Sequence, residues 1–100
     1  MITRIVKLTF QPEKVHEFLK AFEEIKTKIV DFEGCESLQL LKDIHHEGVY
    51  FTISTWQHED YLNQYRNSEF FDKLWGNTKI HFAAKPEAWS LEGVYSNISR

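Results

Sequence analysis

The feature that most constrains the fold is a change of hydrophobic periodicity at Gln11-Pro12. Residues 1–10 alternate with a period of two and are rich in β-branched side chains, which is typical of a strand. After the proline, apolar residues recur at spacings of three and four, as on one face of a helix: Val15, Phe18, Leu19, Phe22, Ile25 and Ile29. Pro12 suits the first helical turn, because the N–H that proline lacks would have no partner there. The pattern therefore predicts a strand and then an amphipathic helix, which ends near Glu33-Gly34.

The middle of the chain predicts a β-hairpin. Residues 35–44 form the second strand, with Leu38 and Leu40 on one side. Residues 49–56 form the third strand, because β-branched and aromatic side chains dominate this segment. The polar segment 43–48 overlaps the end of the second strand and joins the two strands as a hairpin loop.

The second half predicts a helical region in two pieces and a last strand. Acidic residues after His58 favour the first turn of a short helix, because they complement the positive end of the helix dipole. Ser68 can cap a further helix, which we expect to run raggedly to Ala84. Residues 87–95 form the fourth strand, and residues 96–100 form a polar tail. The order βαββαβ predicts an α+β, ferredoxin-like fold, with a four-stranded antiparallel sheet and helices on one face.

The expected sheet is apolar on both faces. Odd-numbered strand positions oppose the even-numbered apolar set and are themselves apolar: Ile5, Val49, Phe51 and Ile53. Helices cover only one face, and a large apolar face in water needs a cover. A second copy of the chain is the simplest cover, so we predict a homodimer.

Composition excludes several classes of protein. One hundred residues match a single domain, 1–100, and a net charge of −3 without a basic stripe argues against nucleic-acid binding. The sequence has no apolar run of about 18 residues, which argues against a membrane span. Cys35 is the only cysteine, so a disulfide framework and a cysteine-based zinc site are excluded. No phosphate-binding, flavin-binding or metal-ligand motif is present, and the first residues do not resemble a signal peptide. We therefore expect a cytoplasmic protein without cofactor or metal.

The aromatic content favours a ligand pocket. Fifteen aromatic residues exceed what a domain of this size needs for its core. We place a small-molecule pocket between the helices and the sheet, with walls from Phe22, Tyr65, Phe71 and Trp75. The Tyr65 hydroxyl is the group we expect to contact a substrate, and His81 at the pocket mouth is the candidate general base, because imidazole takes up a proton near neutral pH. A purely structural role is the alternative for each of these residues.

Two further residues stand out. Trp56 ends the third strand, where it either contacts the substrate or fills the space between the sheet and the second helical region. Arg4 shares a strand face with Val6 and Leu8, and a charged side chain on an apolar face needs a partner. Because Arg4 is near the end of its strand, we expect it to reach solvent and form a surface salt bridge.

Three segments carry a family resemblance. They are the FEGC turn before the second strand, the third strand ending in Trp56, and the stretch WQHEDYLNQYRNSEFF. In that stretch His58 stands at the helix-cap position, Ser68 at a later serine, and Phe70-Phe71 at a His-Phe pair of the family. On these residues the chain resembles the antibiotic biosynthesis monooxygenase domain family of dimeric α+β barrels, over roughly residues 2–95.

The resemblance implies oxygenation of a small aromatic or enolic molecule without metal or flavin, in which the deprotonated substrate reduces dioxygen directly. Such chemistry needs a dry pocket, a base and hydrogen-bond donors for the oxyanion. The haem-degrading branch is similar too, but its axial histidine would fall at about Trp75, its distal asparagine at about Val6 and its pocket tryptophan at about Tyr65. None of these is kept, which argues against haem.

The sequence leaves other functions open. The resemblance favours a monooxygenase-like oxidoreductase. An isomerase or a signal-degrading enzyme of the same superfamily is the first alternative. A non-catalytic dimer that binds a small molecule, for instance in a stress response, is the second. A pocket with converging polar groups favours an enzyme, whereas a pocket filled by its own aromatic side chains favours the non-catalytic protein.

Overall fold

The computed structural model describes residues 1–97, so the last three residues of the predicted polar tail lie outside the described part. The strands within it are β1 (Ile2–Thr9), β2 (Cys35–Lys42), β3 (Val49–Trp56) and β4 (Glu87–Glu92). The helices are α1 (Val15–Val30), which follows a 3-10 turn at Pro12–Lys14, then α2 (Glu59–Arg66) and α3 (Glu69–Lys79).

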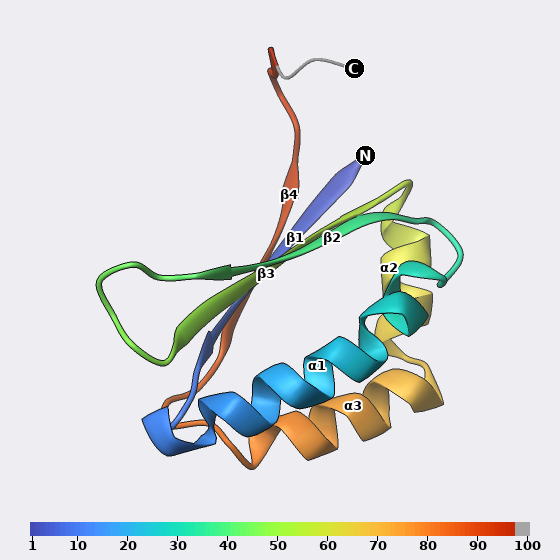
Figure 1. Ribbon diagram of the computed structural model, residues 1–100. Helices are drawn as coiled ribbons and strands as arrows, with labels where there is room; N and C mark the ends of the chain where they lie inside the picture. The colour runs from blue at the N-terminus through green and yellow to red at the C-terminus, as the bar shows by residue number, and fades with distance from the viewer. Residues whose placement is uncertain (98–100) are drawn as a thin grey trace.

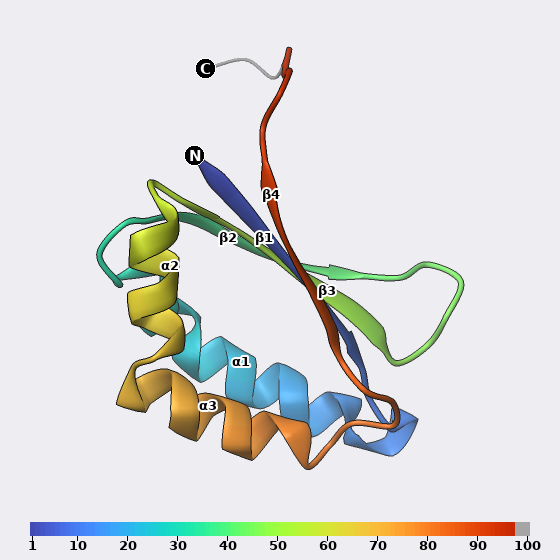
Figure 2. The same ribbon diagram turned by 180° about the vertical axis from the view of Figure 1, so that it is seen from behind.

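The strands form one antiparallel sheet in the order β2-β3-β1-β4. Both views show the three helices on the same side of this sheet, with α1 and α3 side by side and α2 across one end (Figures 1 and 2). This arrangement confirms the predicted α+β, ferredoxin-like fold, including the break in the second helical region.

Strand β2 ends at Lys42, two residues before its predicted end, and two other predicted boundaries are further off. Helix α3 ends at Lys79 instead of running to Ala84, because the following turn pairs with the chain that leaves β1. In that turn Phe82 forms a β-bridge with Phe10, and the Ala83 amide donates to the Thr9 carbonyl at 2.8 Å. The second error concerns β4, which ends at residue 92 and not at residue 95. Backbone pairing across the sheet therefore sets both boundaries, and local periodicity does not record it.

Side-chain caps fix the two short helices. The His58 Nδ1 atom accepts the Asp60 amide at 3.0 Å, which confirms the predicted cap of α2. The Ser68 hydroxyl has two partners: it accepts the Phe71 amide at 3.0 Å and donates to the Tyr65 carbonyl at 2.6 Å. One hydroxyl thus closes α2 and opens α3, and it fixes the angle between them.

Glycine is required at the end of α1. Gly34 has φ 86°, in the left-handed region that side chains with a Cβ rarely adopt. A Cβ atom there would also overlap the ring of Tyr61 at the start of α2. The left-handed turn predicted at Glu33-Gly34 is therefore confirmed, and it lets the α1–β2 connection lie directly against α2.

The core consists of two clusters of buried side chains between the sheet and the helices. The first contains Leu8, Phe10, Phe18 and Tyr50. The second contains Ile29, Trp56, Leu62 and Tyr65. Members of both clusters also line a cavity, so the space between the helices and the sheet is not completely filled.

Candidate functional site

The cavity has a volume of about 310 Å³ and lies between the sheet and the helices. Strands β1 and β3 and helices α1, α2 and α3 supply most of its wall. The apolar part of the wall includes Leu8, Phe18, Phe22, Ile25, Leu62, Phe71 and Trp75. The polar part consists mainly of hydroxyl and guanidinium groups, on Arg4, Thr52, Ser54, Tyr65, Arg66 and Thr78. An apolar space with a few polar groups is the usual form of a small-molecule site.

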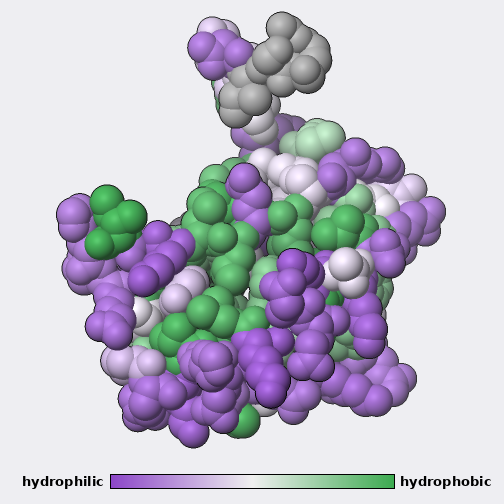
Figure 3. Space-filling model, viewed as in Figure 1, coloured by the Kyte–Doolittle hydropathy of each residue, from purple (hydrophilic) through white to green (hydrophobic). Residues whose placement is uncertain are grey.

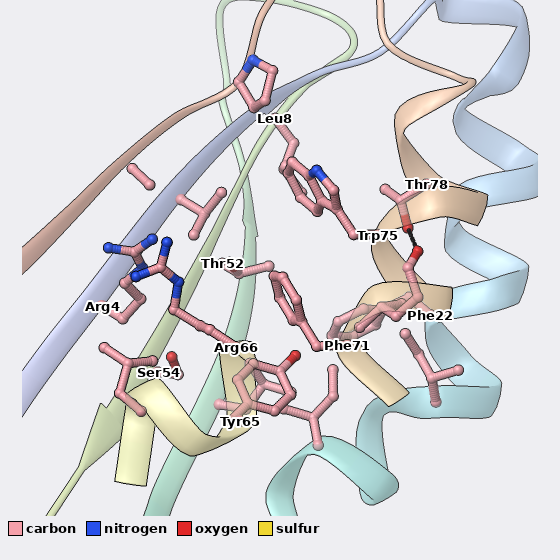
Figure 4. Close-up of a pocket in the computed structure, with 18 of the residues that line it drawn as sticks. Arg4, Leu8, Phe22, Thr52, Ser54, Tyr65, Arg66, Phe71, Trp75 and Thr78 are labelled. Carbon is pink, nitrogen blue, oxygen red and sulfur yellow. Dashed lines mark hydrogen bonds between the residues drawn. The ribbon is translucent and has the colours of Figure 1, made fainter. Parts of the chain in front are cut away.

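The structure places Phe22, Tyr65, Phe71 and Trp75 in the wall of this cavity. Figure 4 shows the rings of Tyr65, Phe71 and Trp75 around one space, with Arg4 across from them. The Phe71 and Trp75 rings stack with centroids 6.0 Å apart and an interplanar angle of 9°. Tyr65 meets Phe71 edge to face at 5.0 Å. The break between α2 and α3 therefore brings together aromatic residues from both helices.

Trp56, which we expected either to contact a substrate or to fill the space beside the second helical region, is not among the residues that line the cavity. Its exposed fraction is 0%. Its ring stacks on Tyr65 with centroids 5.2 Å apart, and its Nε1 atom donates to the Ser54 hydroxyl at 2.9 Å. The side chain lies behind Tyr65 and Ser54, so it positions two residues that do line the cavity.

His81 is not among the cavity-lining residues either, so the structure does not bring the predicted base to Tyr65. It lies in the turn after α3, where its carbonyl accepts the Gln11 amide at 3.0 Å. Its Nδ1 atom is buried and has no hydrogen-bond partner within residues 1–97. The early end of α3 is the physical reason, because the turn carries His81 toward the end of β1.

The Tyr65 ring packs among the rings of Phe32, Trp56 and Phe71. Tyr65 is 8% exposed, and in Figure 4 its oxygen points into the space beside Phe71. No hydrogen bond joins this hydroxyl to another described residue. Burial, with a smaller contribution from Cys35, raises the pKa of the Tyr65 phenol well above its usual range. The hydroxyl therefore stays protonated at neutral pH and is available as a hydrogen-bond donor.

Arg4 lines the cavity, and its predicted surface salt bridge is absent from the described part of the chain. Its Nη1 atom instead donates to the Ser90 hydroxyl on β4 at 2.9 Å. Desolvation by burial, and then the charge of Arg66, lower the pKa of Arg4 from its ordinary value. Two positive charges thus lie close together at one side of the cavity.

Sequence reasoning missed Arg66, which also lines the cavity. A signal was available: Arg66 follows the buried Leu62 by four residues, and residues at that spacing share a helix face. Thr52 and Ser54 were missed as well. They occupy strand positions on the same face as Leu38 and Leu40, where the sequence pattern predicts apolar core.

A second cavity of about 260 Å³ lies between α1 and β2 and shares Phe22 and Leu38 with the first. Figure 3 shows apolar side chains around a hollow in this region, with hydrophilic side chains at its margin.

Within residues 1–97, no group of three or more histidine, cysteine or acidic side chains is arranged to hold a metal ion. Nor does any helix in that range have the length and apolar content to cross a membrane.

Comparison with known proteins gives a consistent result. The family profile described as antibiotic biosynthesis monooxygenase matches residues 1–74. A candidate antibiotic biosynthesis monooxygenase from Caulobacter crescentus is 26% identical, with a TM-score of 0.87 over 94% of this chain and 90% of that chain. No curated protein matches the sequence.

Two more distant solved structures share the fold. A conserved protein from Methanosarcina mazei is 21% identical, with a TM-score of 0.84 over 91% of each chain. A candidate antibiotic biosynthesis monooxygenase from Deinococcus radiodurans is 14% identical, with a TM-score of 0.88 over 100% of each chain. At these identities the likeness concerns the fold alone.

Proposed function

The chain belongs to the antibiotic biosynthesis monooxygenase family, and from this premise we propose that it is a cytoplasmic, cofactor-independent monooxygenase of a small aromatic or enolic metabolite. One observation supports this most: an apolar cavity encloses the hydroxyl of Tyr65, which has no partner within the described chain. A neutral donor in a dry, apolar space stabilises an oxyanion more strongly than the same donor in water.

In the proposed reaction, an enol or phenol loses a proton and the resulting carbanion bonds to dioxygen. Loss of water from the hydroperoxide leaves one oxygen atom in the product as a carbonyl. The two electrons and two hydrogens that reduce the other oxygen atom to water come from the substrate. Tyr65 donates a hydrogen bond to the substrate oxygen that becomes negatively charged, and Phe71 and Trp75 bind the ring system.

Tyr65 is assigned as a donor and not as the base. Its raised pKa keeps the phenol protonated at neutral pH, so it cannot accept the substrate proton there. His81, our sequence-based candidate, reaches the cavity only if the turn after α3 moves. We therefore propose that the substrate proton leaves to water at the open side of the cavity.

The test is the variant Tyr65→Phe, which keeps the ring and removes one donor. Its unfolding free energy should change by at most about 1 kcal/mol. Oxygen uptake is measured with naphthols, hydroquinones and enolisable diketones, and labelled dioxygen should introduce one atom into the product. We expect the variant to lose about tenfold or more in rate. The proposal is contradicted if none of these compounds increases oxygen uptake by the wild type, or if Tyr65→Phe is as active as the wild type.

A second candidate is a non-catalytic small-molecule-binding protein. Two observations favour it. No histidine of the described residues 1–97 lines the cavity, and Glu87, an acidic residue in its wall, pairs with Lys7 at 3.9 Å. Binding of a compound without oxygen uptake or any change in the compound would support this function. No feature of the cavity favours the isomerase or signal-degrading alternative.

The proposed assembly is a homodimer formed through the sheet face opposite the helices. On that face Ile5 lies between Ile53 of β3 and Trp89 of β4 in the strand register. Trp89 is 42% exposed and its neighbour in the next row, Leu91, is 46% exposed. Sedimentation of the 11.9 kDa chain at micromolar concentration should give about twice that mass. A monomer under these conditions contradicts the assembly.

A further inference from the structure

Neither arginine of the cavity forms an ion pair with an acidic side chain of residues 1–97. The ion pairs among residues 1–97 involve lysine and histidine side chains, and neither Arg4 nor Arg66 takes part in one. Glu87 also lines the cavity, but its carboxylate is directed to Lys7. The cavity therefore presents two guanidinium groups and an apolar wall, with no resident negative charge directed at the guanidinium groups.

The two guanidinium groups come from different parts of the fold. Arg4 occupies a position of β1 that faces the helices, in register with Ser54 and Ser90. The Ser90 hydroxyl accepts a hydrogen bond from the Arg4 Nη1 atom. Arg66 lies in the last turn of α2, and Figure 4 shows its side chain reaching toward Arg4 across the sheet side of the cavity. Both side chains line the same cavity; burial first, and then the positive charge of Arg66, lower the pKa of Arg4.

Such a pair is unfavourable without an anion. Two like charges close together repel, and partial burial of Arg4 reduces the screening by water. A carboxylate between them would accept charge-assisted hydrogen bonds from both planar groups, an arrangement for which arginine is especially suited. The part of the wall formed by Phe71, Trp75 and aliphatic side chains carries no charge and suits an aromatic body.

We propose that the ligand of this cavity is a small aromatic carboxylate, whose carboxylate lies between Arg4 and Arg66 and whose ring lies against Phe71 and Trp75. This inference deepens the proposed function and rests on it, because it names the substrate class of the same cavity. The volume of about 310 Å³ is near the lower limit of common ligand sites, so the body is one or two fused rings. The carboxylate anchors the molecule, and the Tyr65 hydroxyl then contacts the reacting oxygen.

The experiment compares naphthoate with naphthamide, which has the same shape and no charge. Dissociation constants are measured by titration calorimetry for the wild type, Arg4→Gln, Arg66→Gln and the double variant. Lys73→Gln is the matched control, because it removes one positive charge from an exposed side chain outside the cavity. Arg66→Lys keeps the charge and loses the planar fork.

We expect the wild type to bind naphthoate about tenfold or more tightly than naphthamide. Each arginine variant should lose part of this preference and the double variant all of it, while naphthamide binding stays within about twofold. Lys73→Gln should keep the full preference, and Arg66→Lys an intermediate one. Equal affinity of the wild type for the two probes, no binding of naphthoate, or a preference that survives in the double variant overturns the inference.

Failure of the inference is distinguishable from failure of the proposed monooxygenase. Carboxylate preference without oxygen uptake by any aromatic acid supports the anion site and contradicts the oxygenase. Oxygenation of neutral phenols with no preference for acids supports the oxygenase and contradicts the anion site. Arg66 is exposed, so its variant also tests the site if the Arg4 variant does not fold.

Discussion

At their centres, the two faces of the sheet carry side chains of the opposite polarity to what their surroundings predict. The face under the helices carries Arg4, Thr52 and Ser54 near its centre. The face without helices carries Ile5 and Ile53 at its centre. Adjacent residues of β1 therefore have different neighbours: Arg4 is paired with Ser54 under the helices, and Ile5 is paired with Ile53 on the outer face. At these central positions coverage by helices does not determine polarity, because the covered residues line a cavity and the outer ones, in our proposal, lie in a dimer interface.

The largest expected effect compares a tryptophan from each face. Trp56→Ala should lower the free energy of unfolding by about 3–5 kcal/mol, because it removes a fully buried ring from the second core cluster. Trp89→Ala is the matched control on the outer face, and it should cost less than about 1 kcal/mol in the dilute monomer. Urea titrations measure both values. Similar costs for the two substitutions would show that the faces do not differ in this way.

The next effect concerns association. Ile53→Asp places a charge in the centre of the outer face, where burial against a second copy would leave it unpaired. The dimer dissociation constant should rise about a hundredfold or more, which is about 2.7 kcal/mol, as measured by sedimentation. His45→Asp introduces the same side chain in the exposed β2–β3 loop and should leave association unchanged. If both variants dimerise like the wild type, the outer face is not the interface.

A smaller effect compares two serine hydroxyls. Ser54→Ala removes the acceptor of the buried Trp56 Nε1 atom and should cost about 1–3 kcal/mol, because the N–H is left without a partner. Ser37→Ala removes an exposed hydroxyl that bonds Thr55 at 2.6 Å, and its cost should stay within about 0.5 kcal/mol. Chemical denaturation of both variants gives the comparison, and a reversed order would contradict it.

The smallest effect appears only at alkaline pH. The folded chain raises the pKa of Tyr65, so the unfolded chain releases this proton first as pH rises. The free energy of unfolding of the wild type should therefore fall relative to that of Tyr65→Phe above about pH 10. Below about pH 10 the two free energies should change in parallel with pH. Tyr95→Phe removes a hydroxyl that is exposed and should follow the wild type. Parallel curves for Tyr65→Phe at all pH values would show that the phenol is not desolvated.

Periodicity predicted most of the fold because each helix and strand carries its own signal. The stripe of α1 and the caps at His58 and Ser68 are local features, and the structure confirms them. The end of α3 could not be predicted, because it depends on a backbone bridge between Phe10 and Phe82, far apart in the chain.

The candidate site was predictable in its aromatic part only. Phe22, Tyr65, Phe71 and Trp75 are large apolar or amphipathic residues on helix stripes, and such stripes face the sheet. Arg66 and Ser54 are polar residues at positions facing the core, and a sequence pattern assigns such positions to solvent or treats them as exceptions. His81 was misplaced together with the boundary of α3.

The strand order has a consequence for how the chain is synthesised. Strand β1 lies between β3 and β4, so the first strand to be translated pairs along one edge with the last. Until β4 has been translated, Arg4 cannot form its hydrogen bond with Ser90, and the part of the cavity wall at Glu87 is missing. Because pairing across this sequence separation closes a long loop, it is a slow step of folding. A nascent chain halted before residue 87 would hold every aromatic residue of the cavity and still lack the means to fix Arg4, so we expect ligand binding to begin only when translation has passed β4.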